Sequence, residues 1–173
     1  MSRLALVLLT LFVLPLCAGT TQPAQFARFA EPPRKYSFDC PVDWKRDEGV
    51  SDPGAVRFSD PARSGQTYKG VIAVNGKQVP HGEVEDFAHW LLMGLKEHYQ
   101  VKVISQSEVV IDGANGRRTV VEFEIKGTAT KAELITLMKG DYVVNIELYT
   151  PKAAYDGYAK TFDAILRSFK ISE

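Results

Sequence analysis

The sequence predicts an α+β fold in which helices lie on a mainly antiparallel, twisted sheet. Three observations indicate it: stretches in which apolar and polar residues alternate, turn residues that join consecutive stretches into hairpins, and two segments with helical apolar spacing. The predicted order is three short strands, a helix, four longer strands and a closing helix. No internal repeat or long linker separates these elements, so we expect a single folded domain.

The clearest signal lies in residues 131–169. Residues 131–139 and 142–149 both alternate, and Gly140 between them favours a hairpin turn, because glycine adopts positive φ at little cost. The first of these strands carries apolar residues on both faces, which is typical of a central strand covered on both sides. Pro151 lacks the N–H that a sheet ladder needs and is expected to end the second strand.

Two segments have helical periodicity. From Glu83 to Tyr99 the apolar residues cluster on one side, and the acidic start suits the positive end of a helix dipole. Gly94 costs about 1 kcal/mol relative to alanine in a helix, so we expect it to mark a close contact with the sheet. Residues 152–169 form the closing helix, whose aromatic stripe must be buried against the sheet; each large side chain contributes roughly 1.5–3 kcal/mol.

Shorter or less regular stretches supply the remaining strands. They are expected at residues 36–40, 55–59, 71–74, 101–111 and 117–125. Asn75-Gly76 is a strong turn signal and should end the third of them. The loops at 61–70 and 75–82 are the expected contact surfaces, because loops on a rigid scaffold often carry function.

Charge and motif content exclude several classes of protein. The 173 residues include 21 basic and 21 acidic side chains, a net charge of zero. This balance argues against a broad electrostatic footprint for nucleic acid or anionic lipid. No phosphate loop, dinucleotide fingerprint or nucleophile elbow occurs in the sequence. We therefore expect neither an enzyme nor a nucleic-acid-binding protein.

The N-terminal residues predict export. Arg3 precedes residues 4–16, an uncharged apolar run of about 13 residues, which is short for a membrane span and suits the core of a signal peptide. Cleavage after Ala18 leaves a small residue at the cut. The alternatives are lipidation of Cys17, which Leu16 as the preceding residue makes a poor match, and an uncleaved anchor. Each alternative places the folded part outside the cytoplasm, as a periplasmic, secreted or lipid-anchored protein.

The chain thus divides into a signal peptide (1–18), a flexible leader (19–34) and an α+β domain (35–173). The leader has three prolines and no periodicity. Once Cys17 is removed, Cys40 is alone and no internal disulfide can form. Because Cys40 alternates with aromatic residues, we expect a small buried hydrophobe; a reactive thiol is the alternative.

A weak metal signal lies at the start of the first helix. His81, Glu85 and His89 recur at a spacing of four, and a helix beginning at His81 would place all three on one face, as a zinc site requires. Pro80 and Gly82 favour a position of His81 before the helix. We therefore expect a solvated polar face and no firm cofactor, with a zinc, manganese or calcium site as the alternative.

Several short motifs together resemble one family. They are Tyr36-Ser37-Phe38, Pro41-Val42-Asp43-Trp44, Phe58-Ser59-Asp60-Pro61, Asp112-Gly113 with Arg117-Arg118, Gly140-Asp141 and Ser168-Phe169. Over residues 35–171 the chain resembles the PsbP family, the extrinsic proteins of photosystem II and their relatives. The resemblance implies an α/β/α sandwich around an antiparallel sheet and no catalysis. Photosystem members assist the manganese–calcium–chloride centre, bacterial relatives are exported, and a Ran-binding transport protein shares the fold, so the fold does not fix the function.

These observations favour a non-enzymatic exported accessory protein that contacts an unidentified envelope protein. We expect a monomer that meets the membrane only through its signal peptide or a lipid on Cys17. A simple export signal in place of a transit peptide argues against a photosystem role. The alternative is a small-ligand or metal carrier in the periplasm, using the region of His81, Glu85 and His89.

Overall fold

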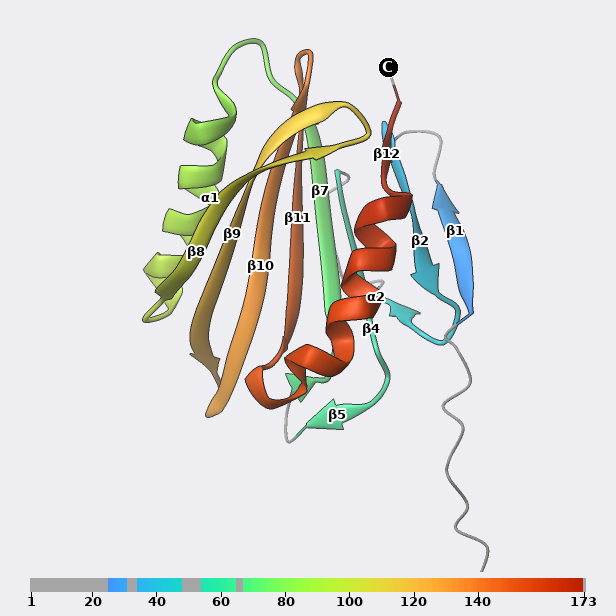
Figure 1. Cartoon of the computed structure of the whole chain (residues 1–173), viewed down its shortest axis with the longest axis vertical. Coiled ribbons are helices and arrows are strands. Elements are labelled where there is room, and N and C mark those ends of the chain that lie inside the picture. The colour runs from blue at the N-terminus through green and yellow to red at the C-terminus, as the bar shows by residue number, and fades with distance from the viewer. Residues whose placement is uncertain (1–24, 31–33, 48–53, 65–66, 173) are drawn as a thin grey trace, which may run out of the picture.

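A computed structural model describes residues 25–30, 34–47, 54–64 and 67–172 of the chain (Figure 1). Its elements are β1 (Phe26–Ala30), β2 (Tyr36–Pro41), β3 (Lys45–Arg46), β4 (Ala55–Ser59), β5 (Arg63–Ser64), β6 (Thr67–Tyr68), β7 (Val71–Gln78), α1 (Val84–His98), β8 (Lys102–Ile111), β9 (Ala114–Ile125), β10 (Thr128–Lys139), β11 (Tyr142–Pro151), the 3₁₀ turn η1 (Lys152–Ala154), α2 (Tyr155–Ser168) and β12 (Lys170–Ile171). The predicted signal peptide and Cys17 lie outside the described residues.

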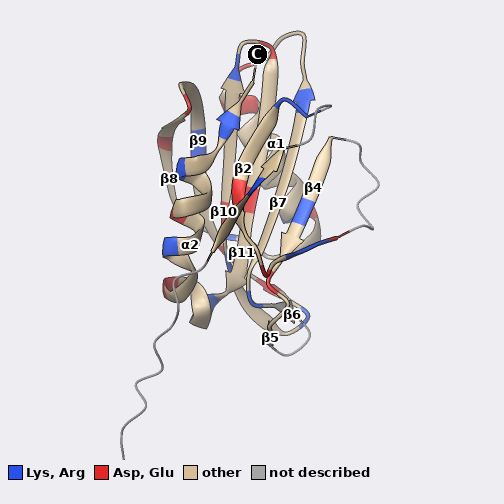
Figure 2. Ribbon diagram, turned by 90° about the vertical axis from the view of Figure 1, so that its right-hand side faces the viewer, with Lys and Arg blue, Asp and Glu red and all other residues tan. Residues whose placement is uncertain are grey.

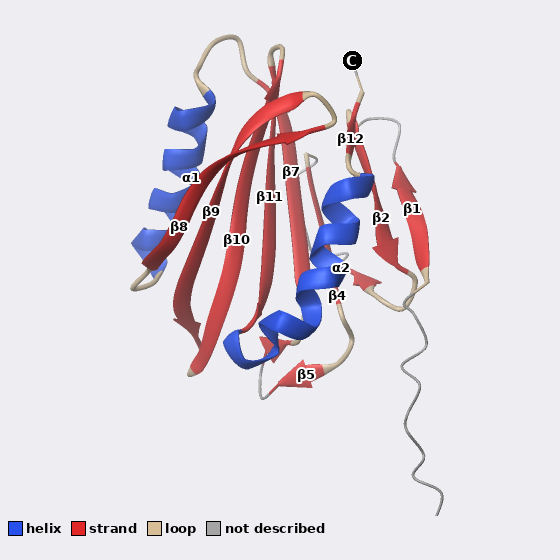
Figure 3. Cartoon of the chain, in the orientation of Figure 1, coloured by secondary structure: helices blue, strands red, loops and turns tan. Residues whose placement is uncertain are grey.

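The fold is organised around a seven-stranded antiparallel sheet. Its strand order is β3-β4-β7-β11-β10-β9-β8. Helix α1 lies on one face and α2 on the other (Figure 3). A second sheet, ordered β1-β2-β12, lies on the α2 side of the molecule (Figure 1). The predicted α+β class with a mainly antiparallel sheet between helices is confirmed, and the small second sheet is an addition to it.

The main core lies between the large sheet, α2 and the small sheet, and aromatic rings dominate it. Phe169, just after α2, stacks on Phe38 with ring centroids 5.8 Å apart and on Tyr36 at 5.9 Å. Phe29 of β1 lies 5.2 Å from Phe38 and 5.3 Å from Phe58 of β4. We call these five rings the aromatic cluster. It joins the large sheet, the small sheet and the end of α2 into one core. The aromatic stripe of the closing helix predicted the burial of α2, and the small sheet was not expected.

Strand β1 corrects the prediction that residues 19–34 form a flexible leader. Residues Phe26–Ala30 pair antiparallel with β2 along their whole length. Arg28 holds the strand in place, because its guanidinium donates hydrogen bonds to Asp39 at 3.1 Å and to the carbonyl oxygen of Ser168 at 2.7 Å. Five residues are too few to show a period, and the contact of Arg28 with Ser168 joins residues far apart in the sequence. Of the rest of the predicted leader, the structure describes only Gln25 and Arg34.

The opposite face of the large sheet carries a smaller core under α1. Leu92 of the helix packs there with Val121 of β9 and with Ala132 and Leu134 of β10. The next residue of β10, Ile135, faces the main core instead. Strand β10 is therefore central and covered on both sides, as its apolar pattern predicted.

The predicted turn at Asn75-Gly76 is wrong. Strand β7 continues through it to Gln78, and Gly76 pairs with a residue in the middle of β11. A Cβ atom on Gly76 would lie 2.9 Å from a ring carbon of Tyr36 and would also overlap the hydroxyl of Tyr142. Glycine is needed here so that two tyrosine rings can approach the strand, and the chain does not reverse. The predicted contact loop at 75–82 is thus half strand.

Charged residues are spread over the whole fold. Figure 2 shows basic and acidic residues interspersed along strands and helices, in keeping with the net charge of zero. Neither helix of the described chain has the length and hydropathy that a membrane span requires. The hairpin turn at Gly140 is present as predicted, with φ +59°.

The two glycines Gly94 and Gly116 allow a paired stability test. The predicted close contact of Gly94 with the sheet is wrong, because an added Cβ would meet nothing within 4 Å. At Gly116 an added Cβ would lie 2.6 Å from Leu137 and would overlap the backbone of Thr136. We expect Gly116→Ala to lower the free energy of unfolding by about 1–3 kcal/mol and Gly94→Ala to raise it by up to about 1 kcal/mol. Urea denaturation of both variants checks this, and equal shifts would contradict it.

Candidate functional site

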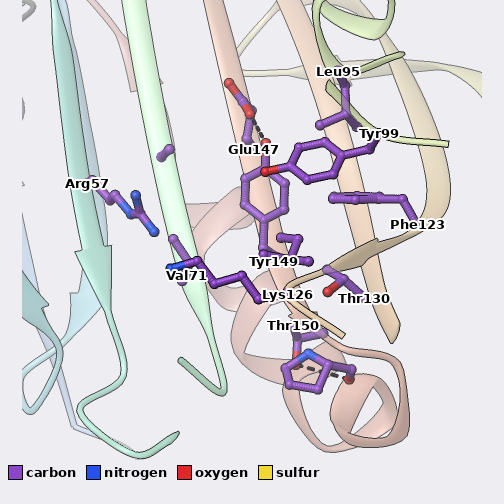
Figure 4. Close-up of a pocket in the computed structure, with 13 residues that line it drawn as sticks. Arg57, Val71, Leu95, Tyr99, Phe123, Lys126, Thr130, Glu147, Tyr149 and Thr150 are labelled. Atoms are coloured by element: carbon purple, nitrogen blue, oxygen red, sulfur yellow. Dashed lines mark hydrogen bonds between the residues drawn. The ribbon is translucent and has the colours of Figure 1, made fainter. Parts of the chain in front are cut away.

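A cavity lies where α1 stops covering the sheet. The helix packs mainly on β9, β10 and β11, so its C-terminal end leaves part of the same sheet face open toward β7 and β4. The cavity there has a volume of about 500 Å³ (Figure 4). It is lined by Arg57, Val71, Ala73, Leu95, Tyr99, Phe123, Ile125, Lys126, Thr130, Glu147, Tyr149, Thr150 and Pro151. We call it the sheet pocket.

Strand register explains why the sheet is hollow at this place. Arg57 of β4 pairs with Ala73 of β7, which pairs with Glu147 of β11. Neighbouring strands lie about 4.8 Å apart, so the backbones of Arg57 and Glu147 are about 10 Å apart. The methyl group of Ala73 fills little of the space between these two long side chains. The pocket is therefore the space that the small side chain of Ala73 leaves between Arg57 and Glu147, in one row of residues that pair across three strands.

Three aromatic rings form one wall of the pocket. The ring of Phe123 lies 5.1 Å from that of Tyr99 and 6.2 Å from that of Tyr149, to which it is nearly perpendicular. Tyr99 ends α1, and its backbone N–H donates a 3.0 Å hydrogen bond to Leu95. The wall thus combines residues of α1, β9 and β11, and offers ring faces and edges to an apolar group.

Glu147 is the acidic residue of the pocket lining. It is partly buried, and the hydroxyl of Tyr149 donates a hydrogen bond to its carboxylate (Figure 4). Burial raises the pKa of Glu147 from 4.5 to about 7, and the positive charge of Arg57 opposes this rise. The carboxyl therefore gains or loses its proton near neutral pH. A group with such a pKa in a cavity is typical of a functional site.

Two basic residues complete the polar lining. The guanidinium of Arg57 extends toward the pocket (Figure 4), and its Nε atom is buried without a hydrogen-bond partner among the described residues. Lys126 is exposed and adopts φ +49° in the turn between β9 and β10. In Figure 4 its side chain extends toward Val71. The polar lining thus contains two permanent cations and one carboxyl with a raised pKa.

The structure sets His81 apart from Glu85 and His89, the other two residues of the predicted metal region. His81 is exposed and lies before α1, whereas Glu85 and His89 belong to the helix. Glu85 and His89 line a second cavity of about 170 Å³, and Gln106 and Arg117 also line it. A guanidinium in the same small cavity disfavours a metal cation. Within the described part of the chain, no group of three His, Cys, Asp or Glu residues is placed to hold a metal ion.

Cys40 is buried at 5% exposure and unpaired, as the alternation around it predicted. Burial, with a smaller contribution from the negative charge of Asp43, raises the pKa of the thiol from 9.0 to about 12. Since the thiolate is the reactive form, Cys40 acts as a packing residue.

Sequence analysis missed the sheet pocket. Alternation marks Glu147 as lying on the wetter face of its strand, but it does not place Arg57 and Ala73 beside it. The available signal was a lone carboxylate between Ile146 and Leu148 in a strongly apolar hairpin. A polar residue in such a position needs a partner or a cavity.

Glu147→Gln should change how the stability of the protein depends on pH. Because the folded-state pKa of about 7 exceeds the ordinary 4.5, the folded state holds this proton more tightly than the unfolded state. The contribution of Glu147 is full below its ordinary pKa and is lost as the pH rises to about 7, by up to about 3 kcal/mol. Urea denaturation at about pH 4.5 and about pH 8 measures the difference.

The Glu147→Gln variant should lose this part of the pH dependence of its stability. Glu124→Gln, an exposed residue of β9, is the control and should keep it. Identical pH profiles of the native protein and Glu147→Gln would contradict the assignment.

Comparisons with known proteins place this fold among several solved structures. CyanoP, the PsbP of the cyanobacterium Synechocystis sp. PCC 6803, is 17% identical with a TM-score of 0.64, over 88% of this chain and 96% of that one. LpqN, described as involved in cell envelope biogenesis of Mycobacterium tuberculosis, is 9% identical with a TM-score of 0.65, over 89% and 88%. A Mog1 variant is 10% identical with a TM-score of 0.59, over 86% and 97%.

At these identities the likeness to solved structures shows the fold alone. No curated protein sequence matches the chain significantly. The sequence model of PsbP, however, matches residues 24–171. That range includes β1 and reaches β12, so it covers the large sheet, the small sheet, both α-helices and the sheet pocket. The chain belongs to the PsbP family.

Proposed function

We propose that this protein is a non-catalytic accessory protein that binds a small organic ligand in the sheet pocket. The pocket itself is the observation that carries the proposal. Its volume of about 500 Å³ is in the usual range for small-molecule sites. Like those sites, it has apolar and aromatic walls and a few converging polar groups, here Arg57, Lys126 and Glu147. This favours the small-ligand carrier over the metal carrier among the alternatives that the sequence left open.

The polar groups of the pocket favour ligand binding over catalysis. Covalent catalysis needs a nucleophile activated by a neighbouring base. The hydroxyl of Thr150 instead donates to the carbonyl oxygen of Lys69 at 2.6 Å, and the carboxylate of Glu147 accepts from Tyr149. Among the described lining residues, these contacts supply no activated nucleophile. Membership of the PsbP family supports the same conclusion.

We place this role outside the cytoplasm. The basis is the N-terminal sequence, in which Arg3 precedes an apolar run and a small residue at position 18. Cleavage after Ala18 leaves a free protein, and a lipid on Cys17 would tether it. LpqN, which shares the fold, is described as involved in cell envelope biogenesis, and this supports the location.

A second candidate function is contact with an envelope protein along β8. This strand ends the large sheet, and its outer edge has no paired strand among the described residues. Val103, Ile104 and Val110 are 37%, 44% and 66% exposed. An open edge with apolar side chains can receive a strand of another protein. This contact could coexist with a ligand in the sheet pocket, because β8 does not contribute to the lining.

Filling the pocket tests the proposal. Ala73→Phe places a ring between Arg57 and Glu147, at a strand position where aromatic residues are tolerated. We expect a panel of charged and neutral aromatic compounds to include some that raise the melting temperature of the native protein, because a ligand of the folded state stabilises it. The same compounds should leave Ala73→Phe unchanged.

Ala27→Phe is the matched control. It makes the same change at an exposed position of β1, in the other layer of the molecule, and should keep the ligand-dependent rise. A panel without any active compound, or a rise that survives in Ala73→Phe, would contradict the proposal.

A further inference from the structure

We infer that the ligand of the sheet pocket is an organic anion, with a carboxylate held by Arg57 and Lys126 and an apolar, aromatic body against Tyr99, Phe123 and Tyr149. This inference rests on the proposed function and goes beyond it by naming the chemical class of the ligand. It follows from three features of the lining: an unpartnered buried donor, an excess of positive charge, and a wall of rings.

The first feature is the donor of Arg57. Its Nε atom is buried and has no hydrogen-bond partner among the described residues. A buried donor without a partner is costly, so a site that keeps one is expected to satisfy it when a ligand binds. A guanidinium offers parallel N–H groups, and a carboxylate accepts two of them at once. The vacant donor therefore favours a carboxylate over an amide or an alcohol.

The second feature is the balance of charge around the pocket. Arg57 comes from β4, Lys126 from the turn between β9 and β10, and Glu147 from β11; α1 contributes the phenol of Tyr99, and β7 contributes only apolar side chains to the lining. With Glu147 protonated, two cations face the ligand and no anion opposes it. With Glu147 ionised, its carboxylate repels an anionic ligand and attracts Arg57 itself.

This balance of charge predicts how the affinity for the ligand changes with pH. The pKa of Glu147 is raised to about 7 by its burial, with Arg57 opposing. A ligand carboxyl in water ionises at about pH 4 and stays ionised throughout the neutral range. Affinity for an anion should therefore be highest below pH 7 and should fall as Glu147 loses its proton.

The third feature is the shape of the aromatic wall. Phe123 lies between Tyr99 and Tyr149, with centroid distances of 5.1 and 6.2 Å. Rings in offset or perpendicular arrangements at such distances attract one another, so an aromatic ligand can extend the group. Because Arg57 and these rings lie on opposite sides of Ala73, the ligand has its charge at one end and its apolar body at the other.

The experiment compares 2-naphthoate with 2-naphthamide, two flat molecules of the same shape that differ in charge. Isothermal titration calorimetry on the full chain gives both dissociation constants. We expect 2-naphthoate to bind about tenfold more tightly at about pH 6, as one charge-assisted hydrogen-bond pair would provide. Arg57→Met should remove most of the preference for 2-naphthoate, because only Lys126 is then left to hold the carboxylate. The retained binding of 2-naphthamide then shows that the variant is folded.

Two further variants sharpen the test. Arg167→Met removes an exposed arginine of α2 on the other side of the sheet and should keep the preference for 2-naphthoate. In the native protein, the affinity for 2-naphthoate should fall severalfold between about pH 6 and about pH 8 as the carboxyl ionises. Glu147→Gln should bind 2-naphthoate equally well at both values.

Each other outcome identifies what has failed. Equal binding of 2-naphthoate and 2-naphthamide would overturn the anion inference and leave the proposed small-ligand function standing. A preference for 2-naphthoate that Arg57→Met leaves undiminished would overturn the assignment of the carboxylate to Arg57. If neither compound binds at millimolar concentration, the anion inference is overturned together with the proposed binding of aromatic ligands.

Discussion

The stacking of Phe169 on Phe38 and Tyr36 is the contact on which the rest of the fold depends. It fixes the end of α2 against β2, and so attaches the small sheet to the large one. With the small sheet in place, Phe29 has a surface to pack against, and β1 becomes part of the domain. Because α2 and the small sheet protect one face of the large sheet, the other face is left to α1 alone. One helix cannot cover seven strands, and the sheet pocket is the uncovered part.

Much of this architecture could be predicted from the sequence. The spacing of apolar residues, every second residue in strands and every third or fourth in helices, is a local property. It predicted both helices, the hairpin around Gly140 and the central position of β10. The buried position of Cys40 also followed from local pattern and is confirmed. Predictions failed where the position of a residue depends on partners that lie far away in the sequence. Asn75-Gly76 looks like a turn but lies inside a strand, because Gly76 makes room for two tyrosine rings.

The candidate site could not be predicted for the same reason. It arises from one row of side chains, Arg57, Ala73 and Glu147, which come from three strands, and β11 lies far from β4 and β7 in the sequence. A shift of register by one residue would turn Glu147 into the main core and remove the pocket. The residues with the most chemical character in the sequence, His81 and His89, are instead separated from each other and from this row. The chemistry of the sheet pocket depends on which side chains the sheet brings together, and only the pairing of the strands determines that.

The small sheet joins the two ends of the folded chain. Its middle strand, β2, pairs with β1 on one side and with β12 on the other, and β12 directly follows Phe169. A chain that emerges with its N-terminus first therefore cannot complete the small sheet until β12 is available. Contacts between such distant segments slow folding. Closure of the main core thus depends on a strand that follows every other element of the domain.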